Sequence, residues 1–356
     1  MKKINLDEKD KIIKNDLQSM ISCIDDLPDQ VADAWKKVKN FIIPAQYLNI
    51  KNIVVLGMGG SAIGADLTKT LVSHESKISV FVLREYDIPN FVDKNTLVIA
   101  SSYSGNTEET ISAFLQARNK GCKLMGITTG GQIEEICNKS DSPVLKIDYN
   151  SQPRAAIGYS LISILGVLAK LGIVNISDDD INDMVMELRM LYQKINLDIP
   201  RKKNQAKELA YKLVDKMPVV VGSGTLSEVA HRLKTQINEN SKQASFWDVL
   251  PELNHNTIVG FEFPKNLKDM IYFVILQSSF DHPRVKIRQQ ITLKILEKNK
   301  IGFETVMLTP SRSPYSEVLK MIYFGDYLSY YLGALNNVNP TPVEQIQFLK
   351  EKLAKS

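Results

Sequence analysis

The chain has 356 residues, of which 44% are hydrophobic and 24% are charged, and its formal net charge is +4. This length exceeds the usual size of a single domain and predicts two, while the composition is that of an ordinary soluble globular protein. The small net charge argues against nucleic-acid binding, because the densest basic cluster, Arg201-Lys202-Lys203, is short and is expected to be the solvated start of a helix.

The cysteines and the apolar segments bear on location. Cys23, Cys122 and Cys137 are odd in number and lack metal-ligand spacing, which favours free thiols in a reducing compartment. The N-terminus has no apolar core of signal-peptide length, and the longest apolar stretch, residues 161–171, is interrupted and too short to span a bilayer. We therefore expect a cytoplasmic protein without membrane contact, metal or cofactor.

The first half of the chain predicts helices followed by an alternating α/β region. Residues 1–45 carry apolar residues at helical spacing, and we expect a helical segment packed on the first domain. Over residues 46–176 short apolar runs alternate with amphipathic segments, which indicates a parallel sheet with helices on both faces. The predicted strands of this first domain are residues 53–56, 79–83, 96–100, 123–127 and 144–147.

The second half repeats parts of this pattern after a charged helical connection over residues 177–199. Three segments resemble parts of the first domain. Residues 218–226 resemble the strand and glycine-rich turn at residues 54–61, residues 270–279 resemble the strand that enters the serine-rich turn after residue 100, and residues 303–308 resemble the strand at residues 123–127. We therefore predict an α/β protein of two doubly wound domains, each with a central parallel sheet flanked by helices, related by a weak internal duplication. The second domain spans residues 200–356 and ends in a C-terminal helix.

The segment from Ser101 to Thr110 concentrates hydroxyl groups between a predicted strand and a predicted helix. Ser102, Ser104 and Thr107 fall around one turn at the positive end of a helix dipole, where backbone N–H groups can receive an anion. One hydroxyl is enough to cap a helix, so three hydroxyls favour a binding site for a phosphate monoester over an ordinary helix cap. In the second domain, the sequence Phe280-Asp281-His282-Pro283-Arg284 stands where the first domain has Gly105-Asn106-Thr107. We therefore expect phosphate to bind only to the first domain, at a single site between the domains.

A glycine turn from Gly57 to Gly64 precedes the serine turn. Its spacing, G-x-G-G-x-x-x-G, is near the dinucleotide fingerprint, but a lone near-match is weak evidence and nucleotide binding leaves the serine cluster unexplained. If the two turns converge at the carboxyl ends of adjacent strands, Gly59, Gly60 and Ser61 pass close under a sugar phosphate.

Three ionisable side chains are candidates for the chemistry. Glu239 ends a helix between two amide side chains and is a candidate general base, with a surface glutamate as the alternative. His255 lies in a polar loop between asparagines and can exchange protons near neutral pH, although a surface histidine fits the pattern equally well. Arg154 opens a helix after the fifth strand, where it either stabilises an oxyanion or makes an interdomain salt bridge.

Together these segments resemble the sugar isomerase (SIS) domain superfamily and, more narrowly, the bifunctional phosphoglucose/phosphomannose isomerase family. The serine motif is typical of the superfamily, whereas the set in this order and spacing is specific to the family. The resemblance covers most of the chain from about residue 50 to the end, and its motifs are residues 57–61, 102–107, 153–156, 238–240 and 252–256.

The resemblance implies a role for each candidate. Glu239 would move the proton between C1 and C2, and Arg154 would stabilise the enediolate. His255, supplied by the partner subunit of a homodimer, would assist ring opening. The family has a lysine on its last helix near the substrate, for which Lys350 is the best match, with Lys352 close by. The residues that would bind the phosphate are Ser61, Ser102, Ser104 and Thr107, with Gly59 and Gly60 in the adjoining loop.

The implied activity is a metal-independent aldose–ketose isomerase that interconverts glucose 6-phosphate, and mannose 6-phosphate, with fructose 6-phosphate. Both aldoses reach one planar cis-enediol(ate), so a single base serves both epimers if the site leaves room for rotation about C2–C3. The alternatives are a non-catalytic SIS-domain sugar-phosphate sensor, the isomerase part of an amidotransferase and, more distantly, a nucleotide-dependent oxidoreductase.

Overall fold

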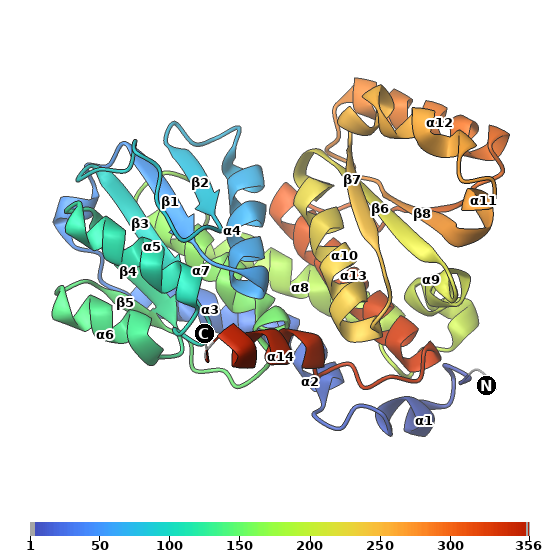
Figure 1. Cartoon of the computed structure of the whole chain (residues 1–356), viewed down its shortest axis with the longest axis horizontal. Helices are drawn as coiled ribbons and strands as arrows, with labels where there is room; N and C mark the ends of the chain where they lie inside the picture. The colour runs from blue at the N-terminus through green and yellow to red at the C-terminus, as the bar shows by residue number, and fades with distance from the viewer. Residues whose placement is uncertain (1–3, 354, 356) are drawn as a thin grey trace. The chain divides into compact units, whose positions relative to one another are not determined.

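The computed structural model describes residues 4–353 and 355. Within this part the chain forms two compact units, which Figure 1 shows in the colours of the chain order. The first unit comprises Asp26–Arg189 and Arg312–Ser316, and the second unit comprises the chain up to Asp25, Met190–Ser311 and the chain from Glu317 onward. Among the described residues, no helix combines the length and the apolar character needed to cross a bilayer.

The first unit is built on a parallel sheet of five strands in the order β2-β1-β3-β4-β5. Its strands are β1 (Asn52–Leu56), β2 (Ser79–Leu83), β3 (Thr96–Ser101), β4 (Lys123–Thr128) and β5 (Val144–Lys146). Its helices are α3 (Leu27–Asn40), α4 (Gly59–Val72), α5 (Glu108–Asn119), α6 (Gly131–Lys139) and α7 (Ile157–Lys170).

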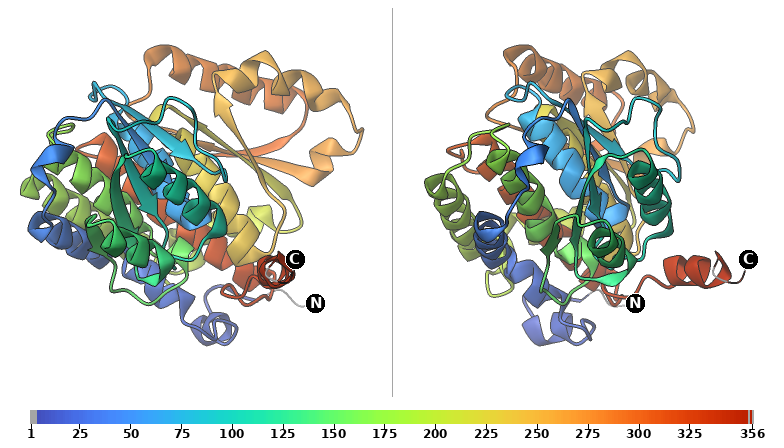
Figure 2. Two further views of the ribbon diagram at one scale, coloured as in Figure 1. Left: turned by 60° about the vertical axis from the view of Figure 1, so that its left-hand side comes forward. Right: turned by 90° about the vertical axis from the view of Figure 1, so that its left-hand side faces the viewer.

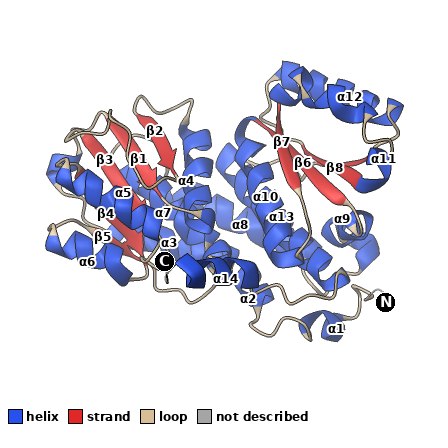
Figure 3. Cartoon of the chain, in the orientation of Figure 1, coloured by secondary structure: helices blue, strands red, loops and turns tan. Residues whose placement is uncertain are grey.

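Side chains alternate between the two faces of this sheet, as the two-residue period of a strand requires. Val54 and Leu56 of β1 share a core cluster with Phe114 of α5 and Ile136 of α6. Every residue of β3 is buried, as expected where helices cover both faces of a parallel strand. Figure 3 shows the strands in red enclosed by helices in blue.

The second unit is built on a parallel sheet of four strands in the order β7-β6-β8-β9. Its strands are β6 (Met217–Ser223), β7 (Phe246–Leu250), β8 (Ile271–Leu276) and β9 (Gly302–Val306). Its helices are α1 (Lys9–Ile13), α2 (Met20–Asp25), α9 (Gln205–Leu213), α10 (Ser227–Ser241), α11 (Leu267–Met270), α12 (Pro283–Lys298) and α14 (Glu344–Leu353). Two helices, α8 (Asp178–Ile195) and α13 (Pro314–Leu335), contribute residues to both units.

The predicted α/β architecture with two parallel sheets is confirmed, and the sheets share one connection order. Strands β2-β1-β3-β4 correspond in chain order to β7-β6-β8-β9, and β5 has no counterpart. The sequence analysis did not predict β7, an edge strand whose first residues Phe246 and Trp247 are exposed. An edge strand packs on one side only, so its apolar pattern is weak.

Of residues 1–45, expected as one segment on the first domain, the described part divides between the units at Asp25. Helix α3 packs against α7 in the first unit. Helix α2 belongs to the second unit, where Tyr323 and Tyr327 of α13 donate hydrogen bonds to the backbone and carboxylate of Asp25. Tyr330 of the same helix donates to Asp16 at 3.1 Å. The N-terminal residues therefore anchor to α13 through buried tyrosines.

Candidate functional site

The serine turn occupies the connection between β3 and α5 in the first unit. Thr107 takes the N-cap position of α5, yet its side chain makes no capping hydrogen bond. Its hydroxyl instead lies 3.1 Å from the hydroxyl of Ser102. Ser102 is buried, Thr107 is half-buried and Ser104 is exposed. The hydroxyls therefore gather at the start of α5 without being used to cap it, at the positive end of the helix dipole.

The backbone of the serine turn is held by the loop between β4 and α6. Gly105 has a φ of +68°, and a Cβ there would lie 1.8 Å from the carbonyl oxygen of Gly130. The amide of Thr129 donates to the carbonyl of Tyr103 at 2.9 Å, and the side chain of Asn106 accepts from the amide of Gln132 at 3.1 Å. The Gly-Asn pair in this turn is thus explained by close backbone approach.

The glycine turn meets the serine turn at the carboxyl ends of the adjacent strands β1 and β3. Helix α4 begins at Gly59, whose φ is +48°. The hydroxyl of Ser61 accepts a hydrogen bond from the amide of Tyr103 at 3.1 Å. In return the hydroxyl of Ser101 donates to the carbonyl of Ser61 at 3.1 Å.

Arg154 lies beside this pair of turns, in the short 3-10 helix η2 (Pro153–Ala155) that precedes α7. The approach is close, because a Cβ on Gly60 would lie 2.8 Å from the backbone nitrogen of Arg154. Only 4% of Arg154 is exposed. The first unit therefore brings together Arg154, both site glycines and all four candidate phosphate-binding hydroxyls.

Two further residues hold this arrangement, and the sequence analysis did not single out either for this role. Gln30 of α3, which is 2% exposed, donates to the carbonyl of Ala155 at 2.8 Å and accepts from the amide of Gly158 at 3.1 Å. Tyr103 of the serine turn accepts a hydrogen bond at its phenol oxygen from the amide of Ser151 at 2.9 Å. Both therefore bind the segment that carries Arg154.

In the second unit, Glu239 lies near the end of α10 and is half-buried. The residues that follow it fasten this helix end to α13. Asn240 donates to the hydroxyl of Ser329 at 3.0 Å, and Ser241 donates to the carbonyl of Ser329 at 2.8 Å. Further along the same two helices, Arg232 and Asp326 form a buried ion pair at 2.9 Å. The backbone that carries Glu239 is therefore firmly placed.

His255 ends the short 3-10 helix η5 (Glu252–His255), which follows β7. The residue is exposed, whereas its neighbours are anchored. Leu253 is fully buried in the core of the second unit, and Asn254 donates to the hydroxyl of Thr292 in α12 at 2.8 Å. An exposed imidazole on an anchored turn can reach a ligand outside its own unit's core.

Glu239 and His255 lie on opposite faces of the second sheet. The cluster that contains Leu253 of η5 also contains Val221 of β6 and Leu296 of α12, and it contains no residue of α10. Helix α10 packs on β6 and β7 from the other side, where the alternate side chain Val220 is buried. Within one copy of the chain the sheet separates these two candidates.

Lys350 lies in α14, a helix with no buried residue. Figure 2 shows this helix in red next to the chain end, after a long loop. The ammonium group of the neighbouring Lys352 lies 5.3 Å from the ring centroid of Phe348, and both lysines are exposed. The choice between the two lysines stays a prediction.

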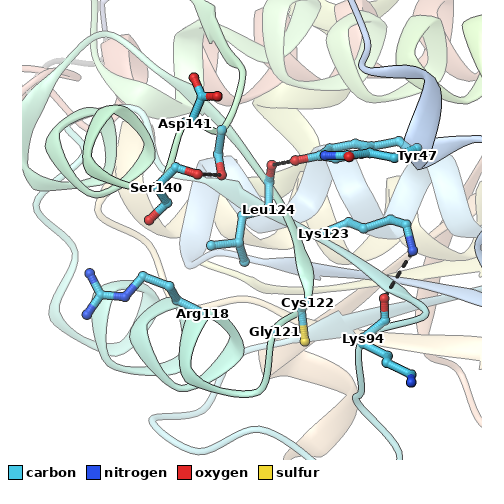
Figure 4. A pocket seen from close by; sticks show the side chains of 11 residues that line it. Tyr47, Lys94, Arg118, Gly121, Cys122, Lys123, Leu124, Ser140 and Asp141 are labelled. Carbon is cyan, nitrogen blue, oxygen red and sulfur yellow. Dashed lines mark hydrogen bonds between the residues drawn. The ribbon is translucent and has the colours of Figure 1, made fainter.

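A hollow of about 500 Å³ lies elsewhere in the first unit, at the amino end of β4. Figure 4 shows Lys94, Arg118 and Lys123 around it, with Lys123 donating to the carbonyl of Lys94. None of the candidate site residues lines it. Because the serine and glycine turns follow the carboxyl ends of their strands, the hollow belongs to the opposite edge of the sheet.

Comparison with known proteins covers nearly the whole chain. Residues 46–165 match the family model described as "SIS domain", and residues 202–353 match "Bacterial phospho-glucose isomerase C-terminal SIS domain". A bifunctional phosphoglucose/phosphomannose isomerase from Caldicellulosiruptor bescii is 43% identical over 94% of this chain and 99% of its own length. One from Aquifex aeolicus is 33% identical over 90% of this chain and 94% of its own length.

The fold also has solved neighbours. A hypothetical protein from Thermus thermophilus superposes with a TM-score of 0.74 at 18% identity, covering 98% of this chain and 93% of that one. At this identity the likeness concerns the fold. It extends over both units, and thus over the two sheets that carry the candidate residues.

Proposed function

Because this chain belongs to the bifunctional phosphoglucose/phosphomannose isomerase family, we propose that it interconverts glucose 6-phosphate and mannose 6-phosphate with fructose 6-phosphate. The observation that carries the proposal is 43% identity to a curated isomerase of that name over almost the full length of both chains. A sugar-phosphate isomerase also accounts for the hydroxyl-lined turn at the start of α5.

Ser61, Ser102, Ser104 and Thr107 bind the phosphate in this proposal. Two observations support them: the turns that carry them are joined by a 3.1 Å hydrogen bond, and the hydroxyl of Thr107 is not used as a cap. The start of α5 adds free backbone amides and the positive end of its dipole. Binding energy from this remote phosphate group holds the sugar while the chemistry proceeds at C1 and C2.

Arg154 stabilises the negative charge that develops on the enediolate oxygen. Its guanidinium keeps its charge at any working pH, and its burial strengthens the interaction with a developing oxyanion. Gly60 allows the glycine turn to approach the backbone of Arg154 closely. The close approach of the glycine turn and the 3-10 helix that carries Arg154 supports a shared role of both around one sugar phosphate.

Glu239 removes the proton from C2 of the aldose and returns it to C1, through a cis-enediol(ate) intermediate. Proton transfer by one positioned carboxylate is typical general base catalysis. The half-buried position of Glu239 and the fastening of its helix to α13 support this role, because proton transfer demands fixed geometry. Lys350, by the family resemblance, lies near the substrate.

His255 assists ring opening and comes from the partner subunit of a homodimer. Its exposure supports this role, as does the sheet that separates it from Glu239 within one chain. A symmetric dimer places two such histidines, one for each site.

The test is an assay of the purified full chain with each aldose 6-phosphate, with and without a chelator, beside Glu239→Gln. We expect fructose 6-phosphate from both substrates, no effect of the chelator, and loss of at least ~1,000-fold in kcat for the variant, in the range of a lost general base or more. Glu297→Gln, which changes an exposed glutamate of α12, is the matched control and keeps full activity.

Each part of the proposal fails on a different result. Full activity of Glu239→Gln removes the base assignment, and turnover of glucose 6-phosphate alone removes the dual specificity. Binding of both sugar phosphates without any turnover in the unaltered protein points instead to a sugar-phosphate sensor.

A further inference from the structure

The second unit contains a structural counterpart of the serine turn, and strand register identifies its residues. Leu56 pairs with Ala100 in the first sheet, and Val221 pairs with Ile275 in the second. Counting onward from Leu56 and Val221 reaches two glycines with nearly the same left-handed φ, +48° at Gly59 and +51° at Gly224. The two glycine turns therefore correspond residue by residue.

The same counting assigns the residues of the second serine turn. Starting from Ala100 and Ile275, Ser104 corresponds to Ser279, and the N-cap residue Thr107 of α5 corresponds to His282, the N-cap residue of α12. Three of the four candidate phosphate-binding hydroxyls are replaced, with Leu226, Gln277 and His282 in place of Ser61, Ser102 and Thr107. Only the hydroxyl of Ser279 remains.

A carboxylate of the chain itself binds this second turn. One oxygen of Glu317 accepts hydrogen bonds from the amide of Ser279 at 2.9 Å and from its hydroxyl at 2.7 Å. The other oxygen accepts from the hydroxyl of Ser278. Glu317 lies in the first turn of α13 and is 5% exposed. These are the donors, an amide and hydroxyls ahead of a helix, that an oxyanion takes.

Other charged groups face the same turn. Lys286 of α12 donates to the carbonyl of Ser279 at 2.8 Å, which adds a positive charge beside the bound carboxylate. Asp281 is also buried and accepts hydrogen bonds from Ser223 and Gln289. Burial raises the pKa of Asp281, and the nearby charge of Glu317 raises it further.

We propose that the second unit contains the counterpart of the phosphate-binding site, in which the carboxylate of Glu317 occupies the position of the phosphate. Each chain therefore binds one phosphate monoester. The proposal rests on the phosphate-binding role of the first serine turn. It explains how a duplicated fold supports a single substrate site, because the second turn is occupied by a built-in carboxylate that excludes phosphate by space and by like charge.

Removal of the carboxylate tests the proposal on the full-length protein, with inorganic phosphate and formate as probes. Glu317→Ala leaves the donors of Ser278 and Ser279 open. We expect formate or phosphate to raise the Tm of this variant by several degrees more than that of the unaltered protein, since an anion that binds only the folded state stabilises it. We expect bound phosphate, measured by equilibrium dialysis, to rise from about one to about two per chain.

The control for the loss of volume is Leu319→Ala, which empties a fully buried position on the same helix. It lowers the Tm but leaves the response to formate and phosphate unchanged. Glu317→Gln keeps the shape and removes the charge, and we expect a lower Tm because an amide cannot accept hydrogen bonds with both terminal atoms. An unchanged Tm for Glu317→Gln contradicts the proposal.

The two proposals fail separately. If Glu317→Ala shows neither an additional rise in Tm with the anions nor additional bound phosphate, the proposed role of Glu317 is wrong. The gain persists in a Ser104→Ala background, because it arises in the second unit. Unchanged phosphate binding in the single variant Ser104→Ala instead contradicts the phosphate-binding role of the serine turn in the first unit.

Discussion

At the scale of single residues, the serine turn shows hydroxyls placed for something other than capping. The hydroxyl of Thr107, the N-cap residue of α5, makes no capping hydrogen bond and instead lies 3.1 Å from the hydroxyl of Ser102. Ser104 is the most exposed of the group, so its hydroxyl is the most accessible to a ligand. An N-cap threonine normally uses its hydroxyl on the N2 or N3 amide, so its different use here favours the phosphate-binding interpretation.

Ser104→Ala tests this interpretation. We expect KM for glucose 6-phosphate to rise about 10-fold or more with a smaller change in kcat, because a hydrogen bond to a charged group contributes roughly 1.5–3 kcal/mol. Steady-state kinetics measure the effect. Ser112→Ala on α5, whose hydroxyl bonds to the carbonyl of Tyr86, is the matched control, and an unchanged KM for Ser104→Ala contradicts the phosphate-binding role of this hydroxyl.

At the scale of elements, α3 supports the segment that carries Arg154. Gln30 lies on the same face of α3 as the buried Leu27, Val31 and Ala34, and its amide group completes the backbone hydrogen bonds of η2 and α7. The N-terminal region therefore supplies hydrogen bonds that hold the segment carrying Arg154. A polar residue on an apolar helix face was the only sequence signal for it.

Gln30→Leu separates positioning from mere stability. The substitution leaves the carbonyl of Ala155 and the amide of Gly158 without their partner, at a cost of roughly 1–3 kcal/mol for an unsatisfied buried group. We expect a lower free energy of unfolding and a lower kcat with little change in KM, because Arg154 shifts while the phosphate-binding serine turn keeps its position. Val31→Ala, a neighbouring fully buried position, lowers stability alone; a kcat equal to that of the unaltered protein in Gln30→Leu rules out the positioning role.

At the scale of the whole molecule, the two sheets share one strand order but differ in what their turns hold. The first pair of turns carries hydroxyls and lies beside the buried Arg154 of η2. The second pair carries the carboxylate of Asp281 and is bound by that of Glu317 from α13. The second unit carries the candidate residues Glu239 and His255 on opposite faces of its sheet. This division predicts that catalysis requires more than one copy of the chain.

Mixing two inactive variants tests this requirement. Glu239→Gln and His255→Ala are each expected to be nearly inactive alone. Dissociated and reassembled together in equal amounts, they form heterodimers in which one of the two sites has both Glu239 and His255, so activity returns to about one quarter of normal by random pairing. Absence of recovery, with heterodimers demonstrated by mass, places His255 in the site of its own chain.

The sequence by itself determined the α/β class, the serine and glycine turns and the family, because each depends on neighbours in the chain. Strand, turn and helix follow one another in residues 96–119, and their period and composition are local properties. Only the tertiary structure shows the edge strand β7, the division of the N-terminal helices at Asp25, and the contacts of Gln30 and Glu317. Each of these depends on contacts between residues far apart in the chain, and spacing along a sequence carries no record of which distant carboxylate or amide will face a given turn.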